Sequence, residues 1–249
     1  MVIVFFLPVC AVAQSNEDCL TCHNDKALKG KRDGRIISVY VDERKFSSSI
    51  HGTLSCINCH SDLEKKELPH EETLKSVACG SCHGEEEKQH SQSLHGKAIA
   101  RGDPLAPHCK DCHGYHDITS IKDPRSVIAP VRIPFVCGKC HQEGAPVQRQ
   151  REIHQSKILE NYSESIHGEA LLKKGLVVTA TCVSCHTAHR ILPHTDARSS
   201  IARRNIASTC IQCHAQIEEV HRKVIKGELW EKEQHVLPAC VDCHQPHKA

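Results

Sequence analysis

Aromatic side chains are scarce in this chain, and no long hydrophobic run follows its first thirteen residues. Phe, Trp and Tyr together make up 3% of the 249 residues. A chain of this length normally buries many large apolar side chains to form its core. The shortage excludes an ordinary apolar core of that size and predicts that bound groups supply much of it. It also predicts no integral membrane span, which needs about 20 consecutive apolar residues.

A strong excess of charge of either sign is missing as well. The 32 basic residues nearly balance the 30 acidic ones, so the formal net charge is +2. No basic patch stands out in the sequence, and aromatic side chains for base stacking are few. We therefore expect no nucleic-acid partner.

The exception to the lack of hydrophobic runs is the N-terminal segment MVIVFFLPVCAVA. Its apolar residues and the small-x-small pattern Ala11-Val12-Ala13 are typical of a signal peptide over residues 1–13, truncated at its start because the usual basic residues are missing. A lipoprotein that begins at Cys10 is the alternative, although Leu7-Pro8-Val9 lacks the small residue expected before such a cysteine. Both interpretations predict export to the periplasm or to the outer surface of the cell.

Cysteine and histidine are abundant, with 17 and 21 residues, and sixteen of the cysteines form eight copies of Cys-x-x-Cys-His. Two thiols at this spacing can bond the two vinyl groups of one haem, and the next imidazole can bind its iron as the proximal ligand. The pattern therefore predicts eight covalently bound haem c groups. The eight copies are Cys19/Cys22/His23, Cys56/Cys59/His60, Cys79/Cys82/His83, Cys109/Cys112/His113, Cys137/Cys140/His141, Cys182/Cys185/His186, Cys210/Cys213/His214 and Cys240/Cys243/His244.

Zinc sites and a disulfide framework are the alternatives, because Cys-x-x-Cys is also half of many zinc sites. Neither has a reason to require histidine directly after every second cysteine. Export agrees with haem, since covalent haem attachment takes place outside the cytoplasm. We therefore favour haem over zinc.

The chain also repeats a longer unit that contains two motifs. Ser93-Leu94-His95-Gly96 precedes the motifs at Cys109 and Cys137, and Ser165-Ile166-His167-Gly168 precedes those at Cys182 and Cys210. Between the two motifs of each unit stand Asp123-Pro124-Arg125-Ser126 and Asp196-Ala197-Arg198-Ser199. A weaker copy begins at Ser49-Ile50-His51-Gly52, and the ends of the chain hold incomplete copies.

The repeat nominates a second set of histidines as distal ligands, because a six-coordinate haem iron needs a second axial ligand. Three of them occur as Cys-His-x-x-His and are expected to bind a neighbouring haem, since they cannot easily turn back to the same iron. The nominated distal ligands are His51, His70, His95, His116, His167, His189, His235 and His247.

Secondary structure between the motifs is expected to be modest. Residues 36–41 alternate as a short strand after the Asp33-Gly34 turn, and residues 150–175 and 212–234 have helical patterns. The sequence predicts a multihaem cytochrome c fold, mainly α and irregular with little β, whose core is dominated by stacked haem pairs. We expect a five-haem region over residues 14–145 and a three-haem region over residues 146–249, joined in one continuous haem chain.

In these elements the chain resembles the multihaem, octahaem c-type cytochromes of respiratory bacteria, which are periplasmic or outer-surface electron carriers with Ser-x-His-Gly and Cys-His-x-x-His elements. The segment Val39-Tyr40-Val41-Asp42-Glu43, which leads to Phe46, is also similar to those proteins. The resemblance implies closely packed, low-potential haems with two histidine ligands, arranged as an electron wire.

Electron transfer in anaerobic respiration is therefore the first hypothesis, with no catalytic residue. An iron with two imidazoles has no vacant position for a substrate. The partners would be other redox proteins, a quinol-oxidising membrane complex or a terminal reductase. One alternative is an octahaem oxidoreductase acting on nitrite, hydroxylamine or tetrathionate, although such enzymes are generally much longer. Another is self-association into an extracellular cytochrome filament.

Overall fold

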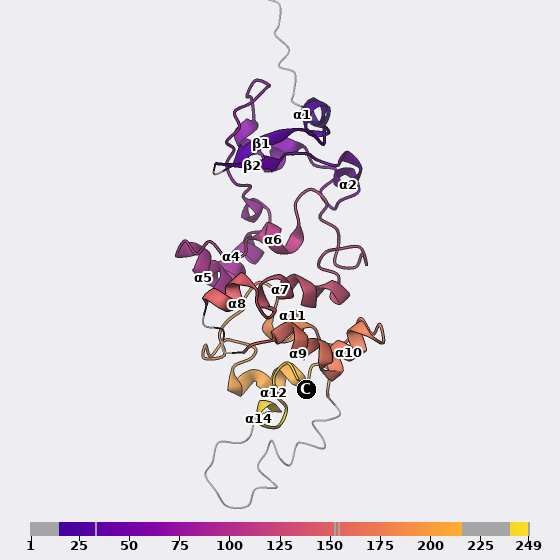
Figure 1. Ribbon diagram of the computed structural model, residues 1–249, viewed down its shortest axis with the longest axis vertical. Helices are drawn as coiled ribbons and strands as arrows, with labels where there is room; N and C mark the ends of the chain where they lie inside the picture. The colour runs from indigo at the N-terminus through magenta and orange to yellow at the C-terminus, as the bar shows by residue number, and fades with distance from the viewer. Residues whose placement is uncertain (1–14, 33, 152, 154, 216–239, 249) are drawn as a thin grey trace, which may run out of the picture. The chain divides into compact units, whose positions relative to one another are not determined.

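The computed structural model describes residues 15–32, 34–151, 153, 155–215 and 240–248 (Figure 1). The expected signal segment with Cys10, most of the expected helix over 212–234, and the nominated ligand His235 lie outside the described residues. No helix of the described part is both long enough and apolar enough to cross a membrane.

Short helices joined by turns dominate the described residues, and their only sheet is a two-stranded hairpin, so the expected mainly helical class is confirmed (Figure 1). The chain divides into two compact units. Unit 1 holds the residues up to Cys79 with His116–Ile118, and unit 2 holds Gly80–Tyr115 with the residues from Thr119 onward. The expected boundary after residue 145 falls inside unit 2, where α7 (Ile133–His141) packs against α8 (Pro146–Gln150) and α9 (Ile158–Glu164).

Unit 1 is built from a helical turn, the hairpin and further short helices. Its elements are α1 (Asn16–His23), β1 (Lys29–Arg32), β2 (Arg35–Ser38), α2 (Glu43–Ser47), α3 (Cys56–Cys59) and η1 (Ser61–Leu63), while η2 (Cys79–Ser81) lies at the boundary between the units. The strand expected over 36–41 ends at Ser38. Beyond it, Val39 N–H donates to Leu28 O at 3.5 Å and Val41 N–H donates to His23 O at 2.7 Å, so this stretch continues from the hairpin to α1.

Unit 2 is an array of helix pairs. Besides α7, α8 and α9, its elements are α4 (Gly84–Gln92), α5 (Leu94–Ala100), α6 (Cys109–His113), η3 (Pro130–Arg132), α10 (Ile166–Leu172), α11 (Cys182–His186), η4 (Arg203–Asn205), α12 (Ile206–Cys210) and α14 (Cys240–Cys243). Helix α4 packs against α5, and α9 packs against α10 in the same way. The prediction of one helix over 150–175 was wrong, because Ser165 separates α9 from α10 and the residues before Ile158 are not helical apart from the end of α8.

Each break in these helix pairs is a serine that caps the second helix. The Ser165 hydroxyl donates to Tyr162 O at 2.7 Å and accepts from Gly168 N–H at 3.1 Å. Ser93 does the same with His90 O at 2.6 Å and Gly96 N–H at 3.0 Å. Serine at an N-cap satisfies an N–H that the helix leaves unpaired. We call residues 90–96 and 162–168 the two Ser-x-His-Gly corners.

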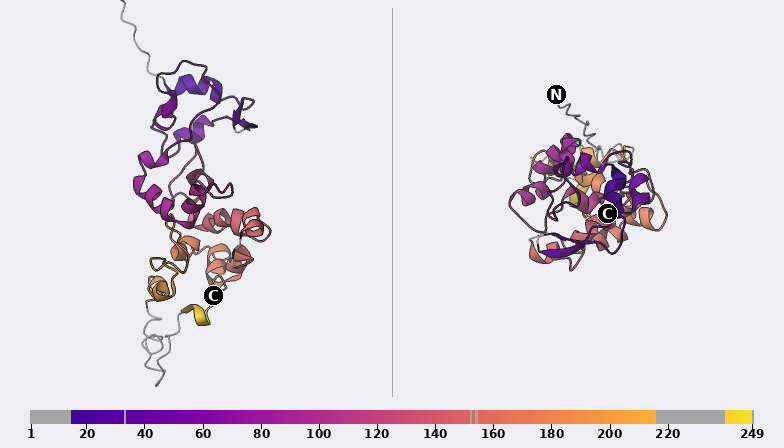
Figure 2. Two further views of the ribbon diagram at one scale, coloured as in Figure 1. Left: turned by 90° about the vertical axis from the view of Figure 1, so that its left-hand side faces the viewer. Right: turned by 90° about the horizontal axis from the view of Figure 1, so that it is seen from above.

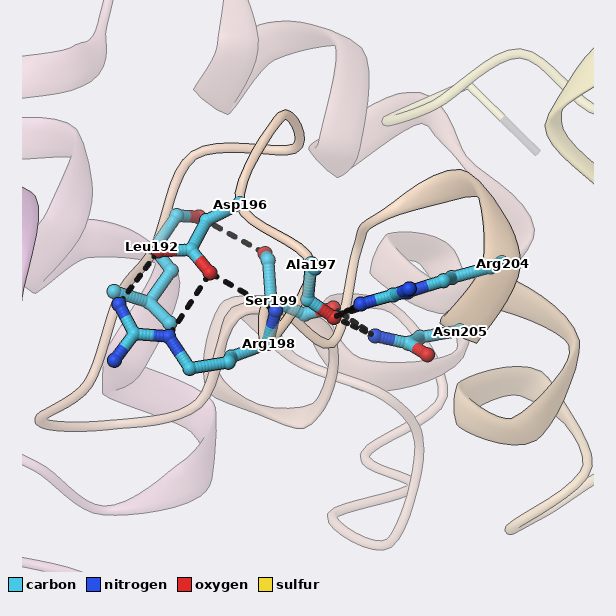
Figure 3. Close-up of polar contacts among 7 residues, drawn as sticks. All are labelled: Leu192, Asp196, Ala197, Arg198, Ser199, Arg204 and Asn205. Carbon is cyan, nitrogen blue, oxygen red and sulfur yellow. Dashed lines mark hydrogen bonds and ion pairs between the residues drawn. The ribbon is translucent and has the colours of Figure 1, made fainter.

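The second repeated element also has the same structure in both copies. In Figure 3, the Arg198 side chain donates from Nε to Asp196 Oδ1 at 3.0 Å and from Nη2 to Oδ2 at 2.8 Å. The buried Ser199 hydroxyl donates to Leu192 O at 3.0 Å (Figure 3). Arg125 binds Asp123 with distances of 3.1 and 2.8 Å, and Ser126 donates to Thr119 O at 3.2 Å. The sequence repeat is therefore also a structural repeat.

The buried apolar residues of the described part are small in number and in size. Four of the ten are alanines. Large side chains such as Phe135, which is 51% exposed, lie partly outside this core. The full set is Leu63, Ala106, Ala129, Ile133, Ala145, Tyr162, Leu171, Leu192, Ala202 and Ile206.

Candidate metal centres

Short helical turns carry the described Cys-x-x-Cys motifs. One turn of helix brings residues three apart to the same face, so both thiols of a motif project together. Several turns are fixed by the second x residue, whose side chain accepts from the N–H of the residue before the motif. Examples are Asn58 Oδ1 with Ser55 N–H at 2.8 Å and Asp111 Oδ2 with His108 N–H at 2.7 Å. All sixteen motif cysteines are free thiols.

Exposure divides the motif cysteines into two groups. The sequence predicts that all sixteen line a haem-dominated core, but seven of them are exposed in the structure and the other nine are half-buried. The seven lie on or just after short helices, and the few buried apolar side chains of the described residues are too small to cover them. Protein atoms therefore do not bury these thiols, and their bonds to haem stay a prediction. The exposed cysteines are Cys22, Cys59, Cys79, Cys82, Cys109, Cys213 and Cys243.

Histidine rings come together in six pairs, and each pair joins one motif histidine to one nominated distal histidine. Every pair lies within a single unit. The ring centres are 5.9–6.2 Å apart, although the angles between ring planes vary from 6° to 50°. The pairs are His23 with His70, His60 with His116, His141 with His95, His113 with His189, His214 with His167, and His186 with His247.

This spacing fits two imidazoles on opposite sides of one metal ion. A bond from a metal to an imidazole nitrogen is about 2.0 Å, so two rings bound in trans have their centres roughly 6 Å apart. Direct aromatic pairs cover a broader range, about 4.5–7 Å. The narrow spread of the six distances and the constant combination of one motif and one nominated histidine favour axial ligand pairs.

Hydrogen bonds orient three of these imidazoles. His23 Nδ1 lies 2.7 Å from Val39 O, and His70 Nδ1 lies 2.7 Å from Glu71 O. A carbonyl oxygen only accepts, so Nδ1 carries the proton in both rings and Nε2 keeps a lone pair. His247 Nδ1 makes the corresponding bond to Gln155 Oε1 at 2.5 Å. Bonds of this kind orient metal-bound histidines in other proteins.

Burial keeps many of the paired imidazoles neutral at pH 7. It lowers the pKa of His95 and His186 to about 4. Burial is also the main cause that lowers the pKa of six others, which are His60, His113, His116, His141, His167 and His247. A neutral imidazole is the form that binds a metal. His60 Nδ1 is buried and makes no hydrogen bond, so its ring is held by packing alone.

Close approach of the backbone explains the glycine of the Ser-x-His-Gly corners. A Cβ added at Gly96 would collide with His90 O, and one at Gly168 would collide with Tyr162 O. Gly52 has the same relation to Ser47 O in unit 1. The helix that bears His95 or His167 can therefore cross the end of the preceding helix only when this position is glycine.

The two kinds of distal segment are tied together by a backbone hydrogen bond. Leu94 N–H, next to His95, donates to Ile191 O, two residues after His189, at 2.9 Å. In unit 1, Ile50 N–H donates to Ile118 O at 2.9 Å, with His51 and His116 in the matching positions. Each of these bonds therefore links a Ser-x-His-Gly histidine to a Cys-His-x-x-His histidine.

Cysteines from different motifs lie next to one another. The Cys137 and Cys182 side chains are hydrogen-bonded, and this contact raises the pKa of Cys137. Burial, then the neighbouring Cys19, raises the pKa of Cys56 to about 11. Burial and Cys240 do the same for Cys210. Groups bound at these motifs would therefore be neighbours.

Four histidines of the predicted sites have no ring pair described here. His51 and His83 are described, and each interacts with other groups. His235 lies outside the described residues, and its place beside His244 stays a prediction. The sequence did not predict which histidines pair, and it missed the orienting atoms Val39 O, Glu71 O and Gln155 Oε1. A glutamine in a loop far from the motifs gives no sequence signal for such a role.

Comparisons of the chain with protein-family models, with curated proteins and with solved structures found no match. The assignment of the site therefore depends on its own residues and geometry.

Proposed function

We propose that this protein is an electron-transfer octahaem c-type cytochrome. The observation that carries the proposal is the set of six histidine pairs, each with one motif histidine and one distal histidine at about the separation needed for a shared metal. Each motif would attach one haem through its two cysteines, and the paired histidines would hold the iron from both sides. Bound haem supplies an iron that accepts and releases one electron.

The residues favour conduction over catalysis. Paired imidazoles occupy both axial positions, so a substrate has no vacant iron position at those six centres. Burial of the imidazoles excludes water from the ligand nitrogens and keeps them deprotonated. The contacts between cysteines of different motifs bring neighbouring centres close together, as a chain of electron-transfer steps requires.

The proposal extends to location and partners. The N-terminal segment supports export to the periplasm or the outer surface, and the partners would be a quinol-oxidising membrane complex or a terminal reductase. In anaerobic respiration such a carrier passes electrons between these two.

Haem counting tests the cofactor directly. The protein is produced with secretion and covalent haem attachment, and its intact mass and pyridine haemochrome are measured. We expect eight haems per chain, and seven after the double change Cys182→Ala and Cys185→Ala. A zinc protein would carry no covalent haem and would lose its metal to a chelator.

A further inference from the structure

The β1–β2 hairpin concentrates positive charge in an otherwise balanced chain. Residues 26–38 hold five basic residues and one acidic residue, whereas the whole chain has a formal net charge of +2. The basic residues are exposed, and the hairpin lies at the edge of unit 1 (Figure 2). They are Lys26, Lys29, Lys31, Arg32 and Arg35. The balance over the whole chain hid this cluster, so the sequence-based statement that the chain has no basic patch was wrong.

One face of the hairpin combines these charges with an exposed apolar side chain. Lys31 pairs with Ile36 across the strands, and Lys29 pairs with Ser38 two residues further on, so these four side chains share a face. Ile36 is 79% exposed. We call Lys29, Lys31, Ile36 and Ser38 the hairpin face. Apolar residues surrounded by charge are typical of surfaces that bind another protein.

Within the described residues, none of the five basic side chains forms an ion pair with a carboxylate. Arg32 donates from Nη2 to the uncharged Ser76 Oγ at 3.1 Å. Arg32 and Arg35 stand directly opposite each other, and like charges in this position destabilise a hairpin. An anionic partner would relieve that repulsion.

The hairpin is bonded directly to one candidate metal centre. Val39, the residue after β2, accepts from His23 Nδ1 at 2.7 Å, and Val41 N–H donates to His23 O at 2.7 Å. His23 belongs to the pair with His70. A protein bound to the hairpin would therefore lie close to this centre.

We infer that the hairpin face is the docking surface for an acidic redox protein, which exchanges electrons with the centre held by His23 and His70. The inference rests on the proposed function, because it assumes haem at that centre. One electron passes from the reduced partner to the ferric iron, and the reverse transfer balances equally. Positive charge would steer the acidic partner to this end of unit 1 and raise the association rate.

The test compares two variants with equal changes in charge. The first carries Lys29→Glu and Lys31→Glu on the hairpin face. The control carries Lys65→Glu and Lys88→Glu, two lysines whose side chains are 88% and 68% exposed elsewhere on the surface. Haem content and the low-spin spectrum are checked first, and dithionite, which needs no docking surface, must reduce each protein fully. The probe is flavodoxin hydroquinone, a small acidic electron donor.

We expect the second-order rate of reduction by flavodoxin to fall about tenfold in the hairpin variant and to lose most of its dependence on salt, while the control stays within about twofold of the unchanged protein. An unchanged rate, or equal loss in both variants, would overturn the inference. So would a changed potential or haem content of the first centre with an unchanged rate, because the lysines would then bind haem propionates.

A lipid surface is distinguished by a further measurement. If the hairpin variant lost binding to phosphatidylglycerol vesicles while its reaction with flavodoxin stayed unchanged, the face would bind lipid and the inference would be wrong. Failure of the proposed function looks different from all these results. In that case the unchanged protein itself would carry no haem and flavodoxin would reduce none of the variants.

Discussion

Each imidazole of the His23–His70 pair presents a lone pair toward a shared centre. Both Nδ1 atoms donate to backbone carbonyls, so neither ring has a second N–H with which to bond the other. Two lone-pair nitrogens have no mutual hydrogen bond to make, whereas a metal ion accepts both. At the scale of the residue, this pair is the most direct physical argument for a metal between the rings.

Removal of one distal histidine should open one iron. His189→Ala takes away the partner of His113, so we expect one haem in eight to become five-coordinate and high-spin while all eight stay attached. Electron paramagnetic resonance of the oxidised protein measures this change as a new ferric high-spin signal. His194→Ala is the control, because His194 is exposed. A high-spin signal of equal size in both variants would contradict the assignment of His189.

At the scale of the element, the Ser-x-His-Gly corners show what a sequence pattern hides. Helical periodicity over residues 150–175 is real, but it does not reveal that Ser165 caps a new helix after Glu164. Serine is acceptable within a helix and favourable at its start, and tertiary contacts decide between these positions. The strand over 36–41 was half correct for a similar reason, since Val39 and Val41 bond to α1 and its following turn instead of to a strand.

Filling the corner should destabilise the protein. Gly168→Ala places a methyl group against Tyr162 O, and we expect a loss of about 1–3 kcal/mol in the free energy of unfolding, measured by thermal unfolding of the haem-loaded protein. Gly84→Ala is the matched control, because no atom lies within 4 Å of its added Cβ. That control should change stability by less than about 0.5 kcal/mol. Equal stability of the two variants would show that the corner can relax.

At the scale of the whole molecule, the sequence could supply the candidate ligands but not their partners. Motif spacing identified the proximal histidines, and the repeat nominated distal ones, of which six stand beside a motif histidine. The pairing joins residues far apart in the chain, such as His186 with His247 and His113 with His189. Such contacts depend on how units of the repeat fold onto each other, which local pattern does not encode.

The small apolar core predicts that the chain depends on its bound groups to fold. Ten apolar residues are buried in the described part, and four are alanines, so the apolar area they remove from water is small. We expect protein made without haem attachment to lack a cooperative thermal transition, as measured by far-ultraviolet circular dichroism. The haem-loaded protein is the control. A sharp transition in the apoprotein would show that the polypeptide forms its own core.

The central claim is that the paired histidines close the irons and make the protein a conductor. A potential-poised optical titration, with electron paramagnetic resonance of the same samples, tests it most directly because it measures the number of haems, their ligands and their working range together. We predict eight haems that are low-spin and titrate over a broad range of low potentials. Fewer haems, or a ferric high-spin haem in the fully loaded protein, would contradict the account and favour the oxidoreductase alternative.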